Sequence, residues 1–93
     1  MADVTRDTLV STLEEIALLL ELKGENPFKT RAYRKGADIV QNFDGDIVAR
    51  ATEGDLKGIK GIGDALQQKL HELASTGTLP YYKNLKAEFP PTL

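Results

Sequence analysis

The sequence lacks cysteine and tryptophan and contains a single histidine, His71. The lack of cysteine excludes disulfides, thiol catalysis and thiolate metal sites, and one histidine forms no metal cluster by itself. No stretch approaches the roughly 18 consecutive apolar residues of a membrane span. Charges at Asp3, Arg6 and Asp7 interrupt any secretory signal. These absences predict a cytoplasmic protein that has no membrane partner.

The composition that remains is that of one globular domain. The chain has 93 residues, of which 41% are hydrophobic and 28% charged. A chain of this length buries enough surface to fold without crosslinks. We therefore expect residues 1–93 to form a single domain, and nothing in the sequence indicates more than a monomer.

The net charge of −2 conceals an alternation of acidic and basic segments. The net charge is −4 over residues 1–22, +3 over 23–43, −3 over 44–55 and +2 over 56–93, which sum to −2. Affinity for phosphates depends on local clusters of Lys and Arg rather than on the total charge. The acidic total therefore does not exclude a nucleic-acid partner, and it predicts modest, salt-sensitive binding.

The apolar residues recur with helical spacing, and no strand-like alternation is present. Leu9, Leu13, Ile16 and Leu20 mark one face of a first helix, which Thr5 or Asp7 can cap. The first predicted helix ends at Gly24. Four more are predicted from Pro27 to about Asn42, around 47–51, from Asp64 to Gly77, and from Pro80 through Glu88. The expected fold is all-α, a compact antiparallel bundle of five to six short helices.

Four glycines fall within residues 54–63, immediately before the helix that starts at Asp64. Such density indicates tight turns or close approach of another backbone. We expect Ile62 to enter the core, while the amides of Gly61, Gly63 and Asp64 point outward at a helix N-terminus and can bind phosphate. The alternative is an ordinary glycine-rich turn. The flanking apolar residues favour one helix-hairpin-helix motif over about residues 54–76.

Two lysines lie in unusual positions. On a helical wheel, Lys69 flanks the apolar stripe of its helix, where a lysine commonly lays its stem along the core edge. Lys29 is expected on the apolar face of the second helix, four residues before Tyr33 and at the positive helix end. A bound phosphate or an ion pair with Glu25 would compensate Lys29 equally well. A lysine held among other cations, with Lys57 or Lys60 nearby, can also lose its proton and form a Schiff base with an aldehyde.

Residues 31–35, 56–70 and 76–79 together resemble the amino-terminal domain of family X DNA polymerases, and residues 22–28 and 85–91 resemble its bacterial members. The resemblance covers nearly the whole chain. It implies a helical module that binds the 5′-phosphate side of gapped or nicked DNA. In polymerase beta-like members this domain also removes a 5′-deoxyribose phosphate by Schiff-base β-elimination.

The resemblance assigns roles to individual residues. Lys69 matches the Schiff-base nucleophile, and Lys29, Tyr33 and Lys57 match the residues that bind the 5′-phosphate. Phe28 matches the residue whose ring stacks on the template base, and Gly61 and Gly63 match the glycines of the hairpin. Lys60 and Arg34 complete the expected DNA-binding residues. No cofactor is required, although the hairpin backbone, at Ile59 and Gly61, is expected to hold a Na⁺ or K⁺ ion shared with a DNA phosphate.

The sequence also departs from the family pattern. Ala65 replaces a phosphate-binding lysine, Gln68 replaces a carboxylate that assists proton transfer, and Lys60 replaces the hairpin proline. No paired metal-binding aspartates of a polymerase palm are present, so we expect no polymerisation by this chain and a partnership with the rest of a polymerase. Three functions stay open: a DNA-binding module, an active lyase, and a helix-hairpin-helix scaffold for protein–protein contacts.

Overall fold

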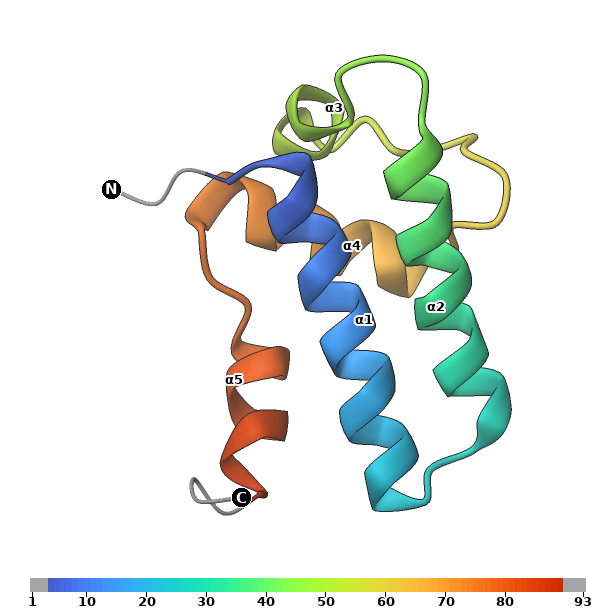
Figure 1. Ribbon diagram of the computed structural model, residues 1–93. Coiled ribbons are helices and arrows are strands. Elements are labelled where there is room, and N and C mark those ends of the chain that lie inside the picture. Colours follow the sequence, from blue (N-terminus) through green and yellow to red (C-terminus); the bar gives the residue numbers. More distant parts are fainter. Residues whose placement is uncertain (1–3, 90–93) are drawn as a thin grey trace.

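The computed structural model describes residues 4–89, which form five α-helices and no β-strand (Figure 1). The helices are α1 (Arg6–Lys23), α2 (Pro27–Asn42), α3 (Ile47–Glu53), α4 (Asp64–Thr76) and α5 (Pro80–Ala87). The predicted all-α fold is confirmed, with five helices. None of the described helices is both long and apolar enough to cross a membrane.

The helix ends follow the capping residues of the sequence. Of the two candidate caps for α1, Thr5 is the one used: its hydroxyl accepts a hydrogen bond from the Thr8 amide, and the Thr8 hydroxyl accepts one from the Thr5 amide, both at 3.2 Å. The side chain of Asn26 caps α2 through the Phe28 amide at 2.9 Å. Asp46 caps α3 through the Ala49 amide at 3.0 Å. These contacts satisfy amides that have no partner within their own helix.

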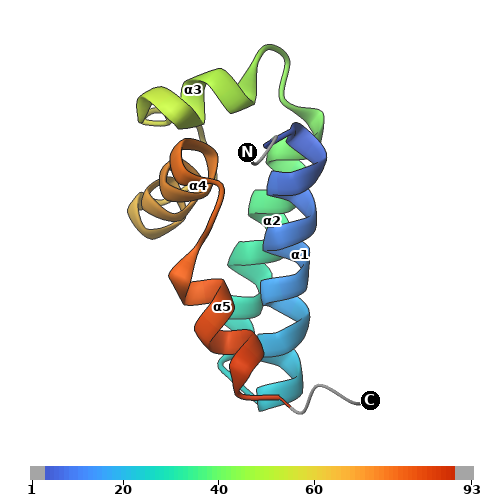
Figure 2. The same cartoon turned by 90° about the vertical axis from the view of Figure 1, so that its left-hand side faces the viewer.

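The helices form two layers rather than a simple antiparallel bundle. Helices α1 and α2 run antiparallel side by side, and α5 lies along α1 in the same direction (Figure 1). Helix α4 crosses behind the α1–α2 pair, and a quarter turn of the molecule brings it almost end-on (Figure 2). The expected antiparallel arrangement therefore holds for α1 and α2 but is wrong for α4. Helices α3 and α4 pack against each other, and α4 lies across the α1–α2 pair.

One hydrophobic core joins all five helices. It includes the predicted stripe of α1, the inward face of α2, and Ile62 from the segment before α4. The side chains buried to 2% exposure or less are Leu9, Leu13, Ile16, Ala17, Leu20, Ala37, Val40, Ile47, Ala51, Leu56, Leu70 and Leu79. Gly36 allows α2 and α4 to approach, because a β-carbon there would lie 3.0 Å from a methyl group of Leu66.

Arg6 closes the open end of α2. Its guanidinium donates hydrogen bonds to the carbonyl oxygens of Val40 (3.3 Å), Gln41 (3.0 Å), Phe43 (2.7 Å) and Gly45 (2.7 Å). The last carbonyls of a helix have no partner within it, and a cation there also favours the helix dipole. A side chain of α1 thus fixes both the end of α2 and the start of the next turn.

Candidate nucleic-acid interface

The segment between α3 and α4 has the geometry expected of a helix-hairpin-helix. Leu56 and Ile62 are buried at 1% and 4% exposure, so both anchor the segment in the core. Between them the chain turns twice, with hydrogen bonds from the Ile59 amide to the Leu56 carbonyl (3.3 Å) and from the Ile62 amide to the Ile59 carbonyl (3.2 Å). Gly61 has a φ of +92°, a conformation that L side chains rarely adopt. The predicted position of Ile62 is confirmed.

The amides at the start of α4 donate no hydrogen bond to any group of the described residues. Gly63 is the N-cap of α4 and provides no side-chain cap. Within residues 4–89, no hydrogen bond has the amide of Gly61, Gly63 or Asp64 as its donor. The Gln67 side chain instead donates to the carbonyl of Ile62 at 3.1 Å, which holds the turn in place. Unpartnered amides at a helix N-terminus form a binding site for an anion.

The space outside these amides is open. A β-carbon added at Gly63 would have no other atom within 4 Å, and its φ of −79° is allowed for any residue. The glycine at this position is therefore not required by the fold. Its absence of a side chain leaves room for a ligand to approach the backbone closely.

Lys57 and Lys60 lie exposed on the turn itself. Neither forms an ion pair with an acidic side chain of the described residues, in contrast to Lys23, Lys29, Arg34 and Arg50. We call Lys57, Lys60, Gly61, Gly63 and the Asp64 amide the hairpin surface. This surface combines cations without partners and amides without partners. The exposed carboxylate of Asp64 is its one negative group and opposes an anionic ligand.

Lys29 lies in solvent rather than on the apolar face of α2. The buried residues of this helix are Thr30, Tyr33, Gly36, Ala37 and Val40, so the stripe reaches Tyr33 from Thr30, three residues earlier, and not from Lys29. The side chain of Lys29 is 56% exposed, and its Nζ atom lies 3.9 Å from Oε1 of Glu25. The expected apolar placement of Lys29 was wrong. The ion pair with Glu25, one of the two alternatives, is present.

Lys69 lies beside two tyrosines. The Tyr33 and Tyr81 rings stack with centroids 6.3 Å apart and planes 7° from parallel, and we call them the tyrosine pair. The Lys69 Nζ atom lies 4.6 Å from the centroid of the Tyr81 ring, and the residue is half-buried. Burial raises the pKa of Tyr33 well above its usual value, and Tyr81 adds to the effect. Tyr33 therefore keeps its proton at neutral pH. Lys69 was expected as the Schiff-base nucleophile and Tyr33 as a 5′-phosphate ligand, but Tyr81 was not predicted, because nothing local in the sequence indicates its contacts with them.

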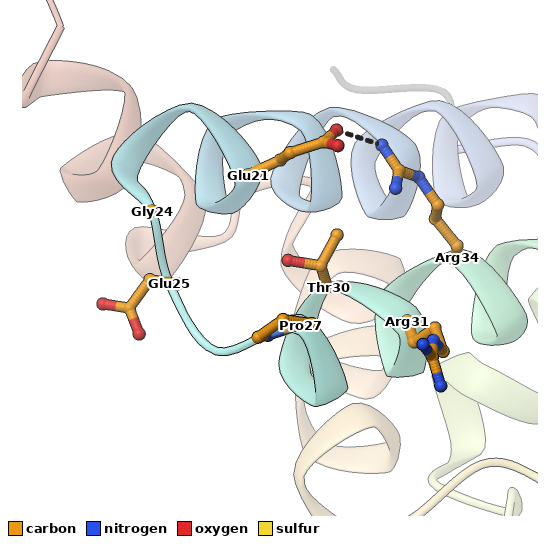
Figure 3. Close-up of a pocket in the computed structure, with 7 residues that line it drawn as sticks. All are labelled: Glu21, Gly24, Glu25, Pro27, Thr30, Arg31 and Arg34. Carbon is orange, nitrogen blue, oxygen red and sulfur yellow. Dashed lines mark hydrogen bonds and ion pairs between the residues drawn. The ribbon is translucent and has the colours of Figure 1, made fainter.

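Phe28 and Arg34 lie on different sides of α2. Phe28 is 75% exposed, and the Arg31 guanidinium lies 5.8 Å from the centroid of its ring. Arg34 points toward α1, where its Nη2 atom lies 2.7 Å from Oε1 of Glu21 (Figure 3). It lines a cavity of about 420 Å³ between the end of α1 and the start of α2. The structure therefore brings Phe28 to open solvent and engages Arg34 in an ion pair away from the hairpin surface.

The carbonyl oxygens of Ile59 and Gly61, the expected ligands of a monovalent cation, have lone pairs free of hydrogen bonds in the described residues. The Ile59 oxygen accepts one hydrogen bond, from Ile62, and keeps a second lone pair. No hydrogen bond within residues 4–89 ends on the Gly61 oxygen. Backbone carbonyls are ligands that Na⁺ and K⁺ accept. No group of three or more His, Cys, Asp or Glu side chains among the described residues could hold another kind of metal ion.

Comparison with known proteins agrees with this geometry. Residues 5–79 match a family model described as a helix-hairpin-helix domain. The chain is 32% identical over 82 residues to the DNA polymerase/3′-5′ exonuclease PolX of Bacillus subtilis (strain 168). This match covers 88% of the chain but only 14% of that relative. No solved structure matches. The chain therefore belongs to the helix-hairpin-helix domain family and matches the amino-terminal region of a bacterial family X polymerase.

Proposed function

We propose that this domain binds DNA through the hairpin surface, on the 5′-phosphate side of gaps and nicks and without sequence specificity. The observation that carries the proposal is the set of unpartnered amides at Gly61, Gly63 and Asp64 beside the unpaired cations Lys57 and Lys60. Amides and ammonium groups bind phosphate oxygens, which carry no base information. Each lysine that neutralises a phosphate also makes the affinity fall with salt.

The 5′-phosphate itself would be held by Lys29 and Tyr33. Lys29 can exchange its partner at low cost, because an exposed ion pair such as that with Glu25 is worth at most about 1 kcal/mol. Tyr33 keeps its proton and can donate a hydrogen bond from one turn further along α2. The exposed ring of Phe28, adjacent to Lys29, is suited to stack on an unpaired base. A Na⁺ or K⁺ ion at the Ile59 and Gly61 carbonyls would add one more positive charge to the hairpin surface.

The test is a titration of the chain onto a gapped duplex with and without a 5′-phosphate. We expect the wild-type protein to prefer the phosphorylated duplex. Lys29→Met should remove the preference, because it deletes the charge and keeps most of the stem. Lys83→Met is the matched control: Lys83 is exposed on α5 and lines a separate hollow with Thr8 and Thr12. Equal and negligible binding to both duplexes would overturn the proposal and favour a scaffold that contacts proteins.

Lys69 supports a second, catalytic function, that of a 5′-deoxyribose phosphate lyase. Its amine lies over the ring of Tyr81, which stacks on Tyr33, the residue proposed to donate a hydrogen bond to the 5′-phosphate. In its neutral form the amine would attack the aldehyde carbon of the ring-opened sugar, and loss of water would give a Schiff base. Elimination would then remove a proton from C2′ and break the C3′–O3′ bond, so that the DNA strand leaves with a 5′-phosphate, and water would hydrolyse the Schiff base to free the lysine. Gln68 cannot take the proton that this step releases, so turnover should be slow.

Borohydride reduction tests the lyase, because it converts a Schiff base into a stable covalent adduct. A wild-type adduct with incised abasic DNA that Lys69→Ala abolishes would support this activity. No adduct, from a protein that binds the same DNA, would leave a binding module without lyase activity. We also infer that the domain serves a longer polymerase, since it spans only 14% of the relative that it matches.

A further inference from the structure

The hairpin surface is bordered by a side chain from a different helix. A β-carbon added at Gly61 would lie 3.5 Å from Cε of Lys35 and in direct contact with the side chain of Ile39. Both residues belong to α2, more than 20 residues earlier in the chain. The stem of Lys35 thus lies over the Gly61 turn, at the place where the backbone amides are unpartnered.

The ammonium group of Lys35 has no acidic partner. Lys35 is exposed, and no carboxylate of residues 4–89 lies within ion-pair distance of it. Lys29 pairs with Glu25 and Arg34 with Glu21, whereas Arg31 also lacks a carboxylate partner among the described residues and lies over the Phe28 ring. No carboxylate of the described residues therefore neutralises the charge of Lys35.

Lys35 and Lys29 lie at different places along α2. The two residues are six positions apart on one helix, which corresponds to about 9 Å along the axis. The Lys29 ammonium lies at Glu25, whereas the Lys35 stem lies at the Gly61 turn. A strand whose 5′ end lies at Lys29 and Tyr33 would present another phosphate near Lys35 and the hairpin amides.

We propose that Lys35 and the Gly61 turn together bind an internal phosphate of the DNA strand, separate from the 5′-phosphate site. This inference rests on the proposed DNA-binding function and adds a second point of contact to it. The second contact is independent of the terminal phosphate. It gives the domain affinity for unphosphorylated DNA, and it fixes the direction of the strand relative to α2.

The test measures affinity against salt concentration for gapped duplexes with and without the 5′-phosphate. Lys35→Met keeps the stem over Gly61 and removes the charge. We expect it to weaken binding to both duplexes by the same factor and to reduce the slope of log affinity against log salt by about 0.9, the value for one lost phosphate contact. Its deficit should then shrink about threefold between 50 and 200 mM salt. Lys35→Arg should restore affinity and slope, and Lys83→Met should leave both unchanged.

Three results would overturn the inference. If the wild-type protein binds and Lys35→Met leaves affinity and slope unchanged, Lys35 contacts no phosphate while the proposed function stands. If Lys35→Met weakens only the phosphorylated duplex, Lys35 belongs to the 5′-phosphate site and no second contact exists. Failure of the wild-type protein to bind either duplex would overturn the proposed function together with this contact. Equal thermal stability of Lys35→Met and wild type excludes unfolding as the cause of any loss.

Discussion

Replacing Gly61 or Gly63 by alanine should separate what the fold requires from what a ligand requires. Gly61 has a φ of +92°, and a β-carbon there would contact the side chain of Ile39. The backbone conformation costs an L residue about 1–2 kcal/mol. Moving the Ile39 side chain off its preferred rotamer adds about 0.5–1.5 kcal/mol. Gly61→Ala is therefore expected to lower the free energy of unfolding by about 2–3 kcal/mol.

Gly63→Ala should behave differently. The φ of Gly63 is −79°, and its added β-carbon would meet nothing within 4 Å. We expect stability within about 0.5 kcal/mol of wild type, or slightly above it because alanine restricts the unfolded chain. If DNA approaches the backbone at this position, the new methyl group would nevertheless weaken DNA binding.

Urea unfolding followed by circular dichroism measures the stabilities, and titration of gapped DNA measures the affinities. With an m-value of about 1 kcal/mol/M, Gly61→Ala should lower the unfolding midpoint by about 2–3 M, while Gly63→Ala should leave it nearly unchanged. Equal midpoints for the two variants would refute the assignment of strain to Gly61. Unchanged DNA affinity in Gly63→Ala would refute close approach of a ligand to the Gly63 backbone.

Three further predictions concern charge and protonation. Arg6→Met should lower the free energy of unfolding by about 2 kcal/mol, because the guanidinium donates hydrogen bonds to four carbonyls. Arg6→Lys should recover only the interaction of the charge with the helix dipole, about 0.3–1 kcal/mol. Full recovery of stability by Arg6→Lys in urea unfolding would contradict this account. Asp64→Asn should raise DNA affinity about threefold at low salt, since it removes a negative charge beside the amides. Glu72→Gln, two turns away on α4, should leave affinity unchanged, and an equal gain in both would indicate only a net-charge effect. The pKa of Tyr33 is raised in the folded state, so its contribution to stability is complete below about pH 10 and is lost at higher pH. A Tyr33→Phe variant should lose stability less steeply above pH 10, and an identical profile in alkaline unfolding would sink this assignment.

Local sequence patterns were sufficient to predict the helices. The caps at Asn26 and Asp46, and the glycines at 24 and 77, are local signals that depend on only a few neighbouring residues. The hairpin was predicted for a similar reason: Ile62 and its flanking glycines occupy ten consecutive residues. Each of these signals is complete within about ten consecutive residues.

The contacts between helices could not be predicted in this way. Arg6 lies over 30 residues from the carbonyls that it caps, and its position at the start of α1 gives no indication of them. The helical pattern of α2 gives Lys35 no contact with the hairpin, and only the packing of α2 against the hairpin brings it to Gly61. The apolar placement of Lys29 failed because a spacing of four residues from Tyr33 fits the helical period about as well as the spacing of three at Thr30. The relative orientation of the helices decides between such alternatives, and no local pattern specifies it.

The most direct test of the DNA-binding surface is the amide NMR spectrum of the chain during titration with a gapped, 5′-phosphorylated duplex. This account predicts that the largest shifts occur at Gly61, Gly63 and Asp64, with further shifts at Lys29 and Lys35. Amides of the separate groove between α1 and α2, near Glu14 and Gln41, should remain unchanged. Shifts confined to that groove, or no shifts at DNA concentrations that saturate other helix-hairpin-helix domains, would contradict the account.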